Sequence, residues 1–496
     1  MTRSTLAVAI ASLSCLTTLS PAQPLNQTVR SLITSQKVGE AKISVAIIEA
    51  DSGRTLAAIN ADAPMIPASN MKVLTSAAAL AVLGPDFVFS TELAIDGPRL
   101  VIRGAGDPAL ADPVLLREMK SSVEEVLTSW VNAVKASNPG SLTEIVIDDR
   151  IFDREYVHPS WPREQLNRWY CAEVSGLTFH TNTIAIYPRP TSPESAPALS
   201  IEPRADWLNI QNRAVTKNSG QNTTWAARPD DSNRITVYGN VRWAPQEPVE
   251  VTIHEPQLFL GRLLSDRLAK AGLPALPVRL AEDRDAAGAG RVVAVVRTPI
   301  DIVMRRCNVN SHNLYAEALI KRVGRQVTGQ PGSWQNGAAV LRMLVQERLG
   351  PADAATLAVA DGSGMSRDNR VTANLLTRWL SSVASDPKIG PAFLESLPVA
   401  AKDGSLKRRF DGKPFSLDVR AKTGYIRSVA SLSGFVSEAT ENADPASQPR
   451  RLVFSIIVND FGKVPLSSIR KFQDEVVRAA HQRLEKTLED GSAMGG

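Results

Sequence analysis

The chain has 496 residues, of which 43% are hydrophobic and 22% are charged, an ordinary globular composition with room for two to four domains. Its formal net charge of +5, from 56 basic and 51 acidic residues, is small for this length. Because no Lys/Arg run or basic-aromatic interleaving occurs, the sequence argues against a nucleic-acid partner. The five histidines have no metal-ligand spacing, so no zinc site is expected.

The first 22 residues have the pattern of a cleaved targeting segment. Arg3 supplies a positive charge, residues 6–19 form an apolar run too short to span a bilayer, and small residues precede a cut after Ala22. Lipid attachment at Cys15 is a weaker alternative, because the apolar run continues past it. No later run reaches about 18 apolar residues, so we expect an exported protein without a transmembrane segment in the mature chain.

Two strands and a buried helix open the mature chain. Residues 42–49 are β-branched and apolar, a turn signal follows, and residues 55–59 are predicted to return as a second strand. Residues 69–83 (SNMKVLTSAAALAVL) are apolar or small on nearly every face, as in a helix buried inside a domain. Gly84-Pro85 ends this helix.

The middle of the chain, residues 88–290, is interpreted as one or two inserted domains, possibly nested and largely β. It is predicted to contain several short strands and two helices, and residues 286–290 (AAGAG) suggest a flexible return. The strands are expected at 92–95, 100–103, 144–147, 235–238 and 249–253, and the helices at 113–135 and 257–271.

The C-terminal third has a second group of strands, predicted at 419–422, 429–436 and 452–458. A polar loop, 437–450, joins the last two, and Ser467 is expected to cap a final helix that runs to about residue 484. Strands at both chain ends with helices between them favour an α+β domain formed by residues 23–87 and 291–496.

Three short motifs follow one another in this framework. Ser69 and Lys72 lie three residues apart at the start of the buried helix, so they share one helix face. Ser311-His312-Asn313 precedes a predicted helix, and Lys422-Thr423-Gly424 lies on a predicted strand. Each is weak alone, but the ordered trio is the set found in penicillin-binding proteins and class A β-lactamases.

The first motif and the strand predict nucleophilic catalysis. Ser69 is the expected nucleophile, and Lys72 is the expected general base, its pKa lowered by burial and by repulsion from Lys422. The backbone N–H groups of Ser69 and Tyr425 are the expected oxyanion donors.

The remaining motif residues have expected roles in proton transfer and substrate binding. Ser311 could carry a proton to the leaving amine, and Asn313 could bond Lys72 and the substrate amide. Lys422 and Thr423 could hold a terminal carboxylate. Gly424 would keep the strand face open for substrate.

The chain resembles the penicillin-binding protein 4 type D-alanyl-D-alanine carboxypeptidases/endopeptidases, the class C low-molecular-mass penicillin-binding proteins. The resemblance covers almost the whole mature chain, and the 238 residues between Lys72 and Ser311 are themselves a mark of the family. Further matching segments are 104–108 (GAGDP), 148–153 (DDRIFD), 177–179 (LTF) with 182–183 (NT), 313–317 (NLYAE) and 361–367 (DGSGMSR).

This resemblance implies a transpeptidase/β-lactamase-like domain, an antiparallel sheet flanked by helices, with a nested insert. It implies an exported enzyme of the periplasm or cell-wall space that acts on peptidoglycan peptide stems, is acylated by β-lactams as covalent inhibitors, and needs no cofactor. It places the nucleophile on Ser69 and the base on Lys72. Residues 361–364 (DGSG) are interpreted as a structural turn. Tyr425 stands where the family often has a small residue or threonine.

Several alternatives remain open at this point. A β-lactamase or another D-amino-acid peptidase would use the same acyl-enzyme, and a non-catalytic wall-binding protein is a minor alternative. The sequence does not divide carboxypeptidase from endopeptidase action. Nor does it decide whether Cys171 and Cys307 form a disulfide or are two separate buried thiols.

Overall fold

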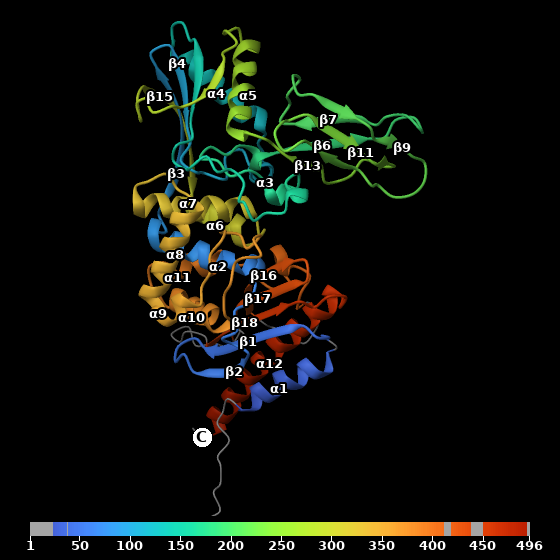
Figure 1. Cartoon of the computed structure of the whole chain (residues 1–496), viewed down its shortest axis with the longest axis vertical. Coiled ribbons are helices and arrows are strands. Elements are labelled where there is room, and N and C mark those ends of the chain that lie inside the picture. Colours follow the sequence, from blue (N-terminus) through green and yellow to red (C-terminus); the bar gives the residue numbers. More distant parts are fainter. Residues whose placement is uncertain (1–22, 37, 411–417, 438–449, 494–496) are drawn as a thin grey trace, which may run out of the picture.

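The computed structural model describes residues 23–36, 38–410, 418–437 and 450–493. The predicted targeting segment and nearly all of the predicted loop 437–450 lie outside these ranges. The molecule is elongated: both chain ends build its lower part, the middle of the chain builds its upper part, and a β-rich arm projects sideways (Figure 1). The predicted α+β fold is confirmed.

A five-stranded antiparallel sheet forms the base of the lower part. Its order is β16-β17-β18-β1-β2, so the N-terminal hairpin completes a sheet begun by the last three strands. The bounds are β1 (Lys42–Glu49), β2 (Thr55–Ile59), β16 (Asp418–Ile426), β17 (Val429–Ser437) and β18 (Arg451–Asn459). Strands β17 and β1 are buried almost throughout, because apolar cores lie on both faces of the sheet.

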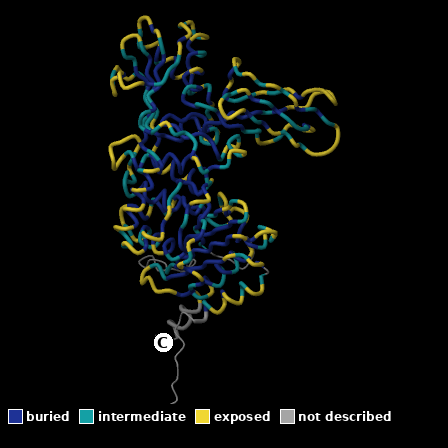
Figure 2. The backbone as a smooth tube through the Cα atoms, in the orientation of Figure 1, coloured by how far each residue is buried: buried dark blue, intermediate teal, exposed yellow. Residues whose placement is uncertain are grey.

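Helices cover both faces of this sheet (Figure 1). On one face α1 (Gln23–Ser35) and α12 (Leu466–Ala493) share an apolar core with the strands. On the other face α2 (Met71–Leu83) runs through the centre of a helical layer and is buried from Met71 to Leu80 (Figure 2). The rest of this layer is α6 (Ile300–Asn308), α7 (Asn313–Thr328), α8 (Trp334–Leu349), α9 (Pro351–Ala355), α10 (Ala373–Ala384) and α11 (Gly390–Glu395).

The upper part contains a second five-stranded sheet of order β14-β5-β4-β3-β15. Its bounds are β3 (Val88–Asp96), β4 (Arg99–Arg103), β5 (Glu144–Asp148), β14 (Val278–Leu280) and β15 (Arg291–Pro299). The helices α3 (Pro113–Glu118), α4 (Val123–Ala136) and α5 (Pro256–Lys270) belong to the same part. Because β15 pairs with β3 along its length, an insert ending at residue 290 would split the sheet; we place its end after Pro299.

The arm consists of residues 183–252 and carries three small sheets. Their orders are β13-β6-β7, β10-β11-β8 and β12-β9. The bounds are β6 (Thr183–Arg189), β7 (Ala198–Glu202), β8 (Ile210–Asn212), β9 (Val215–Thr216), β10 (Trp225–Ala227), β11 (Ile235–Tyr238), β12 (Asn240–Val241) and β13 (Val249–Thr252). The inner faces of these strands join the apolar core of the upper part.

Two helix predictions need correction. The single helix expected at 113–135 is interrupted, because Lys120 adopts a left-handed φ of 55° and Ser122 caps a new helix in a capping box with Glu125. Ser467 does not cap the last helix, which begins one residue earlier at Leu466.

Both cysteines of the described chain, Cys171 and Cys307, are buried and free, which is the second of the two alternatives considered above. Over the described ranges, none of the helices combines the length and the apolarity that crossing a bilayer requires.

Candidate active site

Ser69 and Lys72 lie where the chain enters α2. Ser69 is on a short 3-10 turn, η1 (Ala68–Asn70), and Lys72 is in the first turn of α2, so the helical path brings both side chains to one side. Lys72 is fully buried, and its Nζ lies 3.1 Å from Ser69 Oγ in a hydrogen bond. The sequence prediction that these two groups meet therefore matches the geometry.

Two carbonyl oxygens complete the surroundings of the Lys72 amine. Nζ donates to Asn313 Oδ1 and to the backbone oxygen of Ser363, both at 2.8 Å. Neither oxygen can donate a hydrogen in return. A neutral amine would give its two hydrogens to these acceptors and turn its lone pair toward Ser69 Oγ, which can donate. The site is thus arranged for proton removal from Ser69.

Burial makes the neutral amine accessible near physiological pH. It lowers the pKa of Lys72 from an ordinary 10.5 to about 8, against the opposing attraction of Cys307, Glu317 and Asp361. The pKa of Lys422 also falls well below its ordinary value, first because of burial and then because of the Lys72 charge. Burial is the cause that lowers the pKa of Lys72, and the expected repulsion from Lys422 does not contribute to it.

A second serine–lysine pair faces the first. Ser311, in the turn between α6 and α7, adopts a left-handed φ of 58° and accepts a 2.7 Å hydrogen bond from Lys422 Nζ. The same ammonium donates to the backbone oxygen of Thr423 at 2.7 Å. Lys422 is fully buried and does not line the cleft, so it acts on the cleft through its hydrogen bond to Ser311.

Strand β16 crosses beside η1 at Gly424. A Cβ on this residue would lie 2.9 Å from Ser69 N and from Pro67 O, and 2.2 Å from Ser431 Oγ. The glycine is therefore required for close packing of the strand against the turn. The next residue, Tyr425, has a side chain that is 52% exposed at the cleft.

Asn70 connects the Ser69-x-x-Lys72 motif to the strand of the Lys422-Thr423-Gly424 motif, a role that the sequence did not reveal. Its buried amide lies between β16 and β17, with the nitrogen 2.8 Å from the Lys422 carbonyl oxygen and the oxygen 2.6 Å from Ser433 Oγ. The middle of the Ser69-x-x-Lys72 motif thus fixes the strand that carries the third motif.

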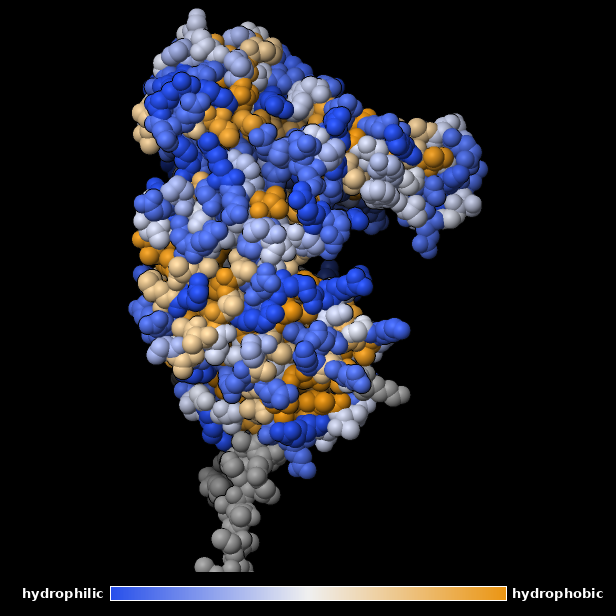
Figure 3. Space-filling model, viewed as in Figure 1, coloured by the Kyte–Doolittle hydropathy of each residue, from blue (hydrophilic) through white to orange (hydrophobic). Residues whose placement is uncertain are grey.

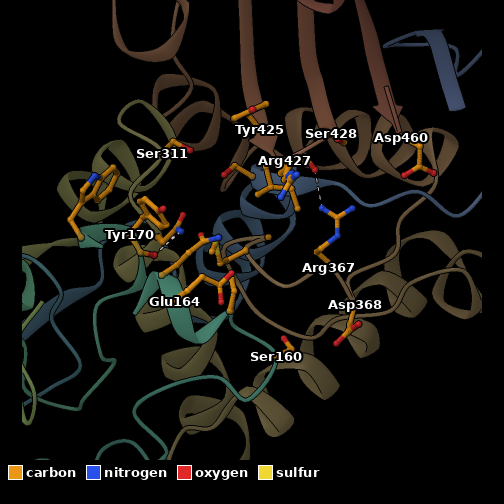
Figure 4. Close-up of a pocket in the computed structure, with 18 of the residues that line it drawn as sticks. Ser160, Glu164, Tyr170, Ser311, Arg367, Asp368, Tyr425, Arg427, Ser428 and Asp460 are labelled. Atoms are coloured by element: carbon orange, nitrogen blue, oxygen red, sulfur yellow. Dashed lines mark hydrogen bonds between the residues drawn. The ribbon is translucent and has the colours of Figure 1, made fainter. Parts of the chain in front are cut away.

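Ser69, Ser311 and Asn313 open into a cleft of about 1080 Å³. Lys72, Lys422 and Gly424 are buried next to it, and Thr423 is half-buried beside Gly424 on β16. Figure 4 shows Ser311 and Tyr425 on one side and Tyr170, Glu164 and Ser160 on another, and Figure 3 shows the surface hollowed between the arm and the lower part. The remaining lining residues are Pro162, Gln165, Trp169, Asn310, Gly364, Met365, Arg367, Asp368, Ile426, Arg427, Ser428, Asp460 and Gly462.

The inserted segment supplies part of this wall. It contributes Trp169 and Tyr170 from the 3-10 turn η3 (Trp169–Cys171), and the Tyr170 carbonyl oxygen accepts a 2.9 Å hydrogen bond from Asn313 Nδ2. The oxygen of the same Asn313 amide accepts the hydrogen bond from Lys72 Nζ. The insert therefore sets the orientation in which Asn313 meets Lys72. This contact gives no signal in the sequence, because any residue type can supply a backbone carbonyl.

The segment 361–369 holds the Ser363 carbonyl against Lys72. Asp361 accepts from Ser366 N at 2.6 Å and from Gly364 N at 2.8 Å, while buried Glu317 accepts from Gly362 N and Ser363 N at 2.8 Å. Desolvation raises the pKa of Glu317 to about 7. The predicted structural turn therefore also contacts Lys72, through the backbone oxygen of Ser363.

Replacing Gly364 with alanine is expected to destabilise the protein by at least about 3 kcal/mol. The residue has a φ of +83°, and a Cβ would lie 1.8 Å from the Ala68 carbonyl oxygen, next to Ser69. Gly53→Ala is the matched control, because Gly53 has a φ of +67° with open space around it and should lose only about 1 kcal/mol. Equal losses in urea unfolding of the two variants would contradict a steric role for Gly364.

Comparisons of the sequence and of the structure with known proteins agree with one another. The profile of the D-Ala-D-Ala carboxypeptidase 3 (S13) family matches residues 25–481. The chain is 29% identical to a D-alanyl-D-alanine carboxypeptidase from Actinomadura sp. (strain R39), over 95% of this chain and 87% of that protein. It also matches the crystal structure of penicillin binding protein 4 from Haemophilus influenzae with a TM-score of 0.73 at 20% identity, covering 91% of this chain and 98% of the other.

Proposed function

The chain belongs to the D-Ala-D-Ala carboxypeptidase 3 (S13) family and is a serine carboxypeptidase, and from this premise we propose that it cleaves D-Ala–D-Ala bonds of peptidoglycan stem peptides through an acyl-enzyme on Ser69. The observation that carries the proposal is the Lys72 amine, held between Ser69 Oγ and two carbonyl oxygens. The enzyme is exported and works in the periplasm or cell-wall space.

Acylation begins when Ser69 Oγ–H gives its proton to the Lys72 lone pair and Oγ attacks the substrate carbonyl carbon. The oxyanion is held by the N–H groups of Ser69 and Tyr425. When the C–N bond breaks, the proton passes from Lys72 to the leaving D-alanine amine, with Ser311 as the relay. A water molecule then attacks the ester carbon and gives one proton to the Lys72 amine, which passes it to the departing Ser69 oxygen, so the shortened peptide and free Ser69 are released.

The remaining motif residues bind the substrate. Thr423 takes the terminal carboxylate, and the anion favours the protonated form of Lys422, whose charge reaches it across Ser311. Asn313 orients both Lys72 and the acyl-side amide. A β-lactam presents its amide carbonyl to the same groups, and we therefore propose that β-lactams acylate Ser69.

The function is tested by incubating the purified mature enzyme with a peptide ending in D-Ala–D-Ala and measuring released D-alanine. Digestion of cross-linked peptidoglycan, followed by muropeptide analysis, distinguishes the two modes of action. Loss of terminal D-alanine alone indicates a carboxypeptidase, and conversion of cross-linked dimers to monomers indicates an endopeptidase as well. Release of no D-alanine from either substrate would contradict the proposal.

A further inference from the structure

Exposed tryptophans are gathered on one part of the molecule. Four of the eight tryptophans are buried, namely Trp130, Trp161, Trp334 and Trp379. The other four are 37–48% exposed: Trp169 lines the catalytic cleft, and Trp207, Trp225 and Trp243 lie on the arm. Large aromatic rings left in water and grouped on one module are typical of a binding surface.

Two of the arm aromatics form a stacked pair on an outward sheet face. Trp225 on β10 lies opposite Tyr238 on β11, and their rings stack with centroids 4.4 Å apart and planes 17° apart. Their strand neighbours Ala226 and Val237 are buried in the core. Since side chains alternate along a strand, Trp225 and Tyr238 face away from that core.

Neutral polar groups extend the same face. Thr236 lies two residues before Tyr238 on β11, and Gln211 on β8 is its register partner. Thr236 is half-buried and Gln211 is exposed, so an amide and a hydroxyl flank the aromatic pair. We call these four residues, Trp225, Tyr238, Thr236 and Gln211, the arm platform.

The backbone around the platform is pre-formed. Thr223 N donates to the Asn240 carbonyl oxygen, and Asn240 N donates back to Thr223 Oγ1, both at 3.0 Å. A little further along, the Asn222 amide bonds the backbone of Trp243 at 2.9 Å through its nitrogen. A surface that is already ordered loses little entropy when a ligand binds.

We propose that the arm platform binds the glycan strand of peptidoglycan, a polymer of N-acetylated hexosamines. The aromatic faces carry partial negative charge and attract the C–H faces of sugar rings, while the amide and hydroxyl groups suit sugar hydroxyls and acetamido groups. This inference rests on the proposed function, because stem peptides are attached to such strands.

The arm lies where a bound glycan strand would bring its stem peptides close to the cleft. The arm projects beside the hollow that leads to the cleft (Figures 1 and 3). At the base of the arm, β13 contacts η3, which carries Trp169 and Tyr170. Thr252 on β13 donates to the Leu166 carbonyl oxygen at 2.6 Å and accepts from Arg228 at 3.2 Å. Holding a glycan strand on the arm would therefore raise the local concentration of its stem peptides near Ser69.

The test uses the full mature enzyme and glycan strands freed from their peptides by an amidase. We expect Trp225→Ala to weaken co-sedimentation or fluorescence-detected binding by about tenfold or more, and Gln211→Ala to weaken it by a smaller factor. Both variants should release D-alanine from a soluble peptide at the wild-type rate, and from intact peptidoglycan more slowly. Trp207→Ala is the matched control: Trp207 is comparably exposed but packs on Phe259, at 5.2 Å between ring centroids, away from the platform.

Wild-type affinity for the strands in both Trp225→Ala and Gln211→Ala would overturn the proposal, as would an equal loss in Trp207→Ala. Binding of intact peptidoglycan without any binding of peptide-free strands would overturn it too, by assigning recognition to the peptides. Failure of the proposed function has a different signature, since the wild type would then release no D-alanine from the soluble peptide, whatever its affinity for glycan.

Discussion

Replacing Ser69 with alanine is expected to abolish D-alanine release, with kcat reduced by about 10³- to 10⁶-fold, because no covalent intermediate can form. The serine is half-buried on η1, so the loss of one hydroxyl should leave unfolding by urea nearly unchanged. The decisive measurement is labelling with a fluorescent penicillin, followed by mass mapping of the labelled peptide. The wild type should carry the label on Ser69, and the variant should carry none.

Ser311→Ala is the matched control, because Ser311 also pairs with a buried lysine and also lines the cleft. Both serines therefore qualify as nucleophiles by proximity to an amine. Ser69 also lies where η1 and β16 approach each other at Gly424, so its own N–H and that of Tyr425 are the expected oxyanion donors. Ser311→Ala should slow turnover while the label still appears on Ser69. Label on Ser311 in the Ser69→Ala protein would reverse the two roles.

Much of the fold follows from local sequence because its strands and its central helix are strongly patterned. The predicted strands 42–49 and 55–59 agree with β1 and β2 to the residue. The error at 113–135 arose because the apolar spacing continues across a break made by the turn at Lys120 and the cap at Ser122. A single left-handed residue leaves hydrophobic periodicity intact, so periodicity could not reveal it.

The motif residues of the candidate site could be predicted because a serine beside a lysine at helical spacing has a chemical signature. The groups that hold these residues in place could not be predicted. The Tyr170 and Ser363 carbonyl oxygens that hold Asn313 and Lys72 come from positions 143 and 291 residues away from their partners. Any residue type supplies a carbonyl, and only the tertiary fold decides where it points.

Replacing Lys72 with methionine is expected to lower the acylation rate by about 10³-fold or more, because Ser69 then has no base. Lys72→Arg is the informative partner variant. A guanidinium keeps the positive charge but does not deprotonate in proteins, so it should be as inactive as methionine if Lys72 acts as a base. Substantial activity in Lys72→Arg, measured by penicillin acylation, would instead assign Lys72 the role of a fixed charge.

The pH dependence gives an independent test of the same residue. Only the neutral amine accepts a proton, so wild-type acylation should rise about tenfold per pH unit below the Lys72 pKa of about 8 and level off above it.

The lowered pKa of Lys72 also makes the free energy of unfolding depend on pH. Below pH 8 the lysine is protonated in both the folded and the unfolded chain, and the full cost of burying its charge is present. Between pH 8 and 10.5 only the unfolded chain keeps the proton, so the wild type should gain on the order of 3 kcal/mol relative to Lys72→Met. A constant difference in unfolding free energy between the two proteins over this range would mean that the buried amine has an ordinary pKa, and therefore cannot serve as the base at neutral pH.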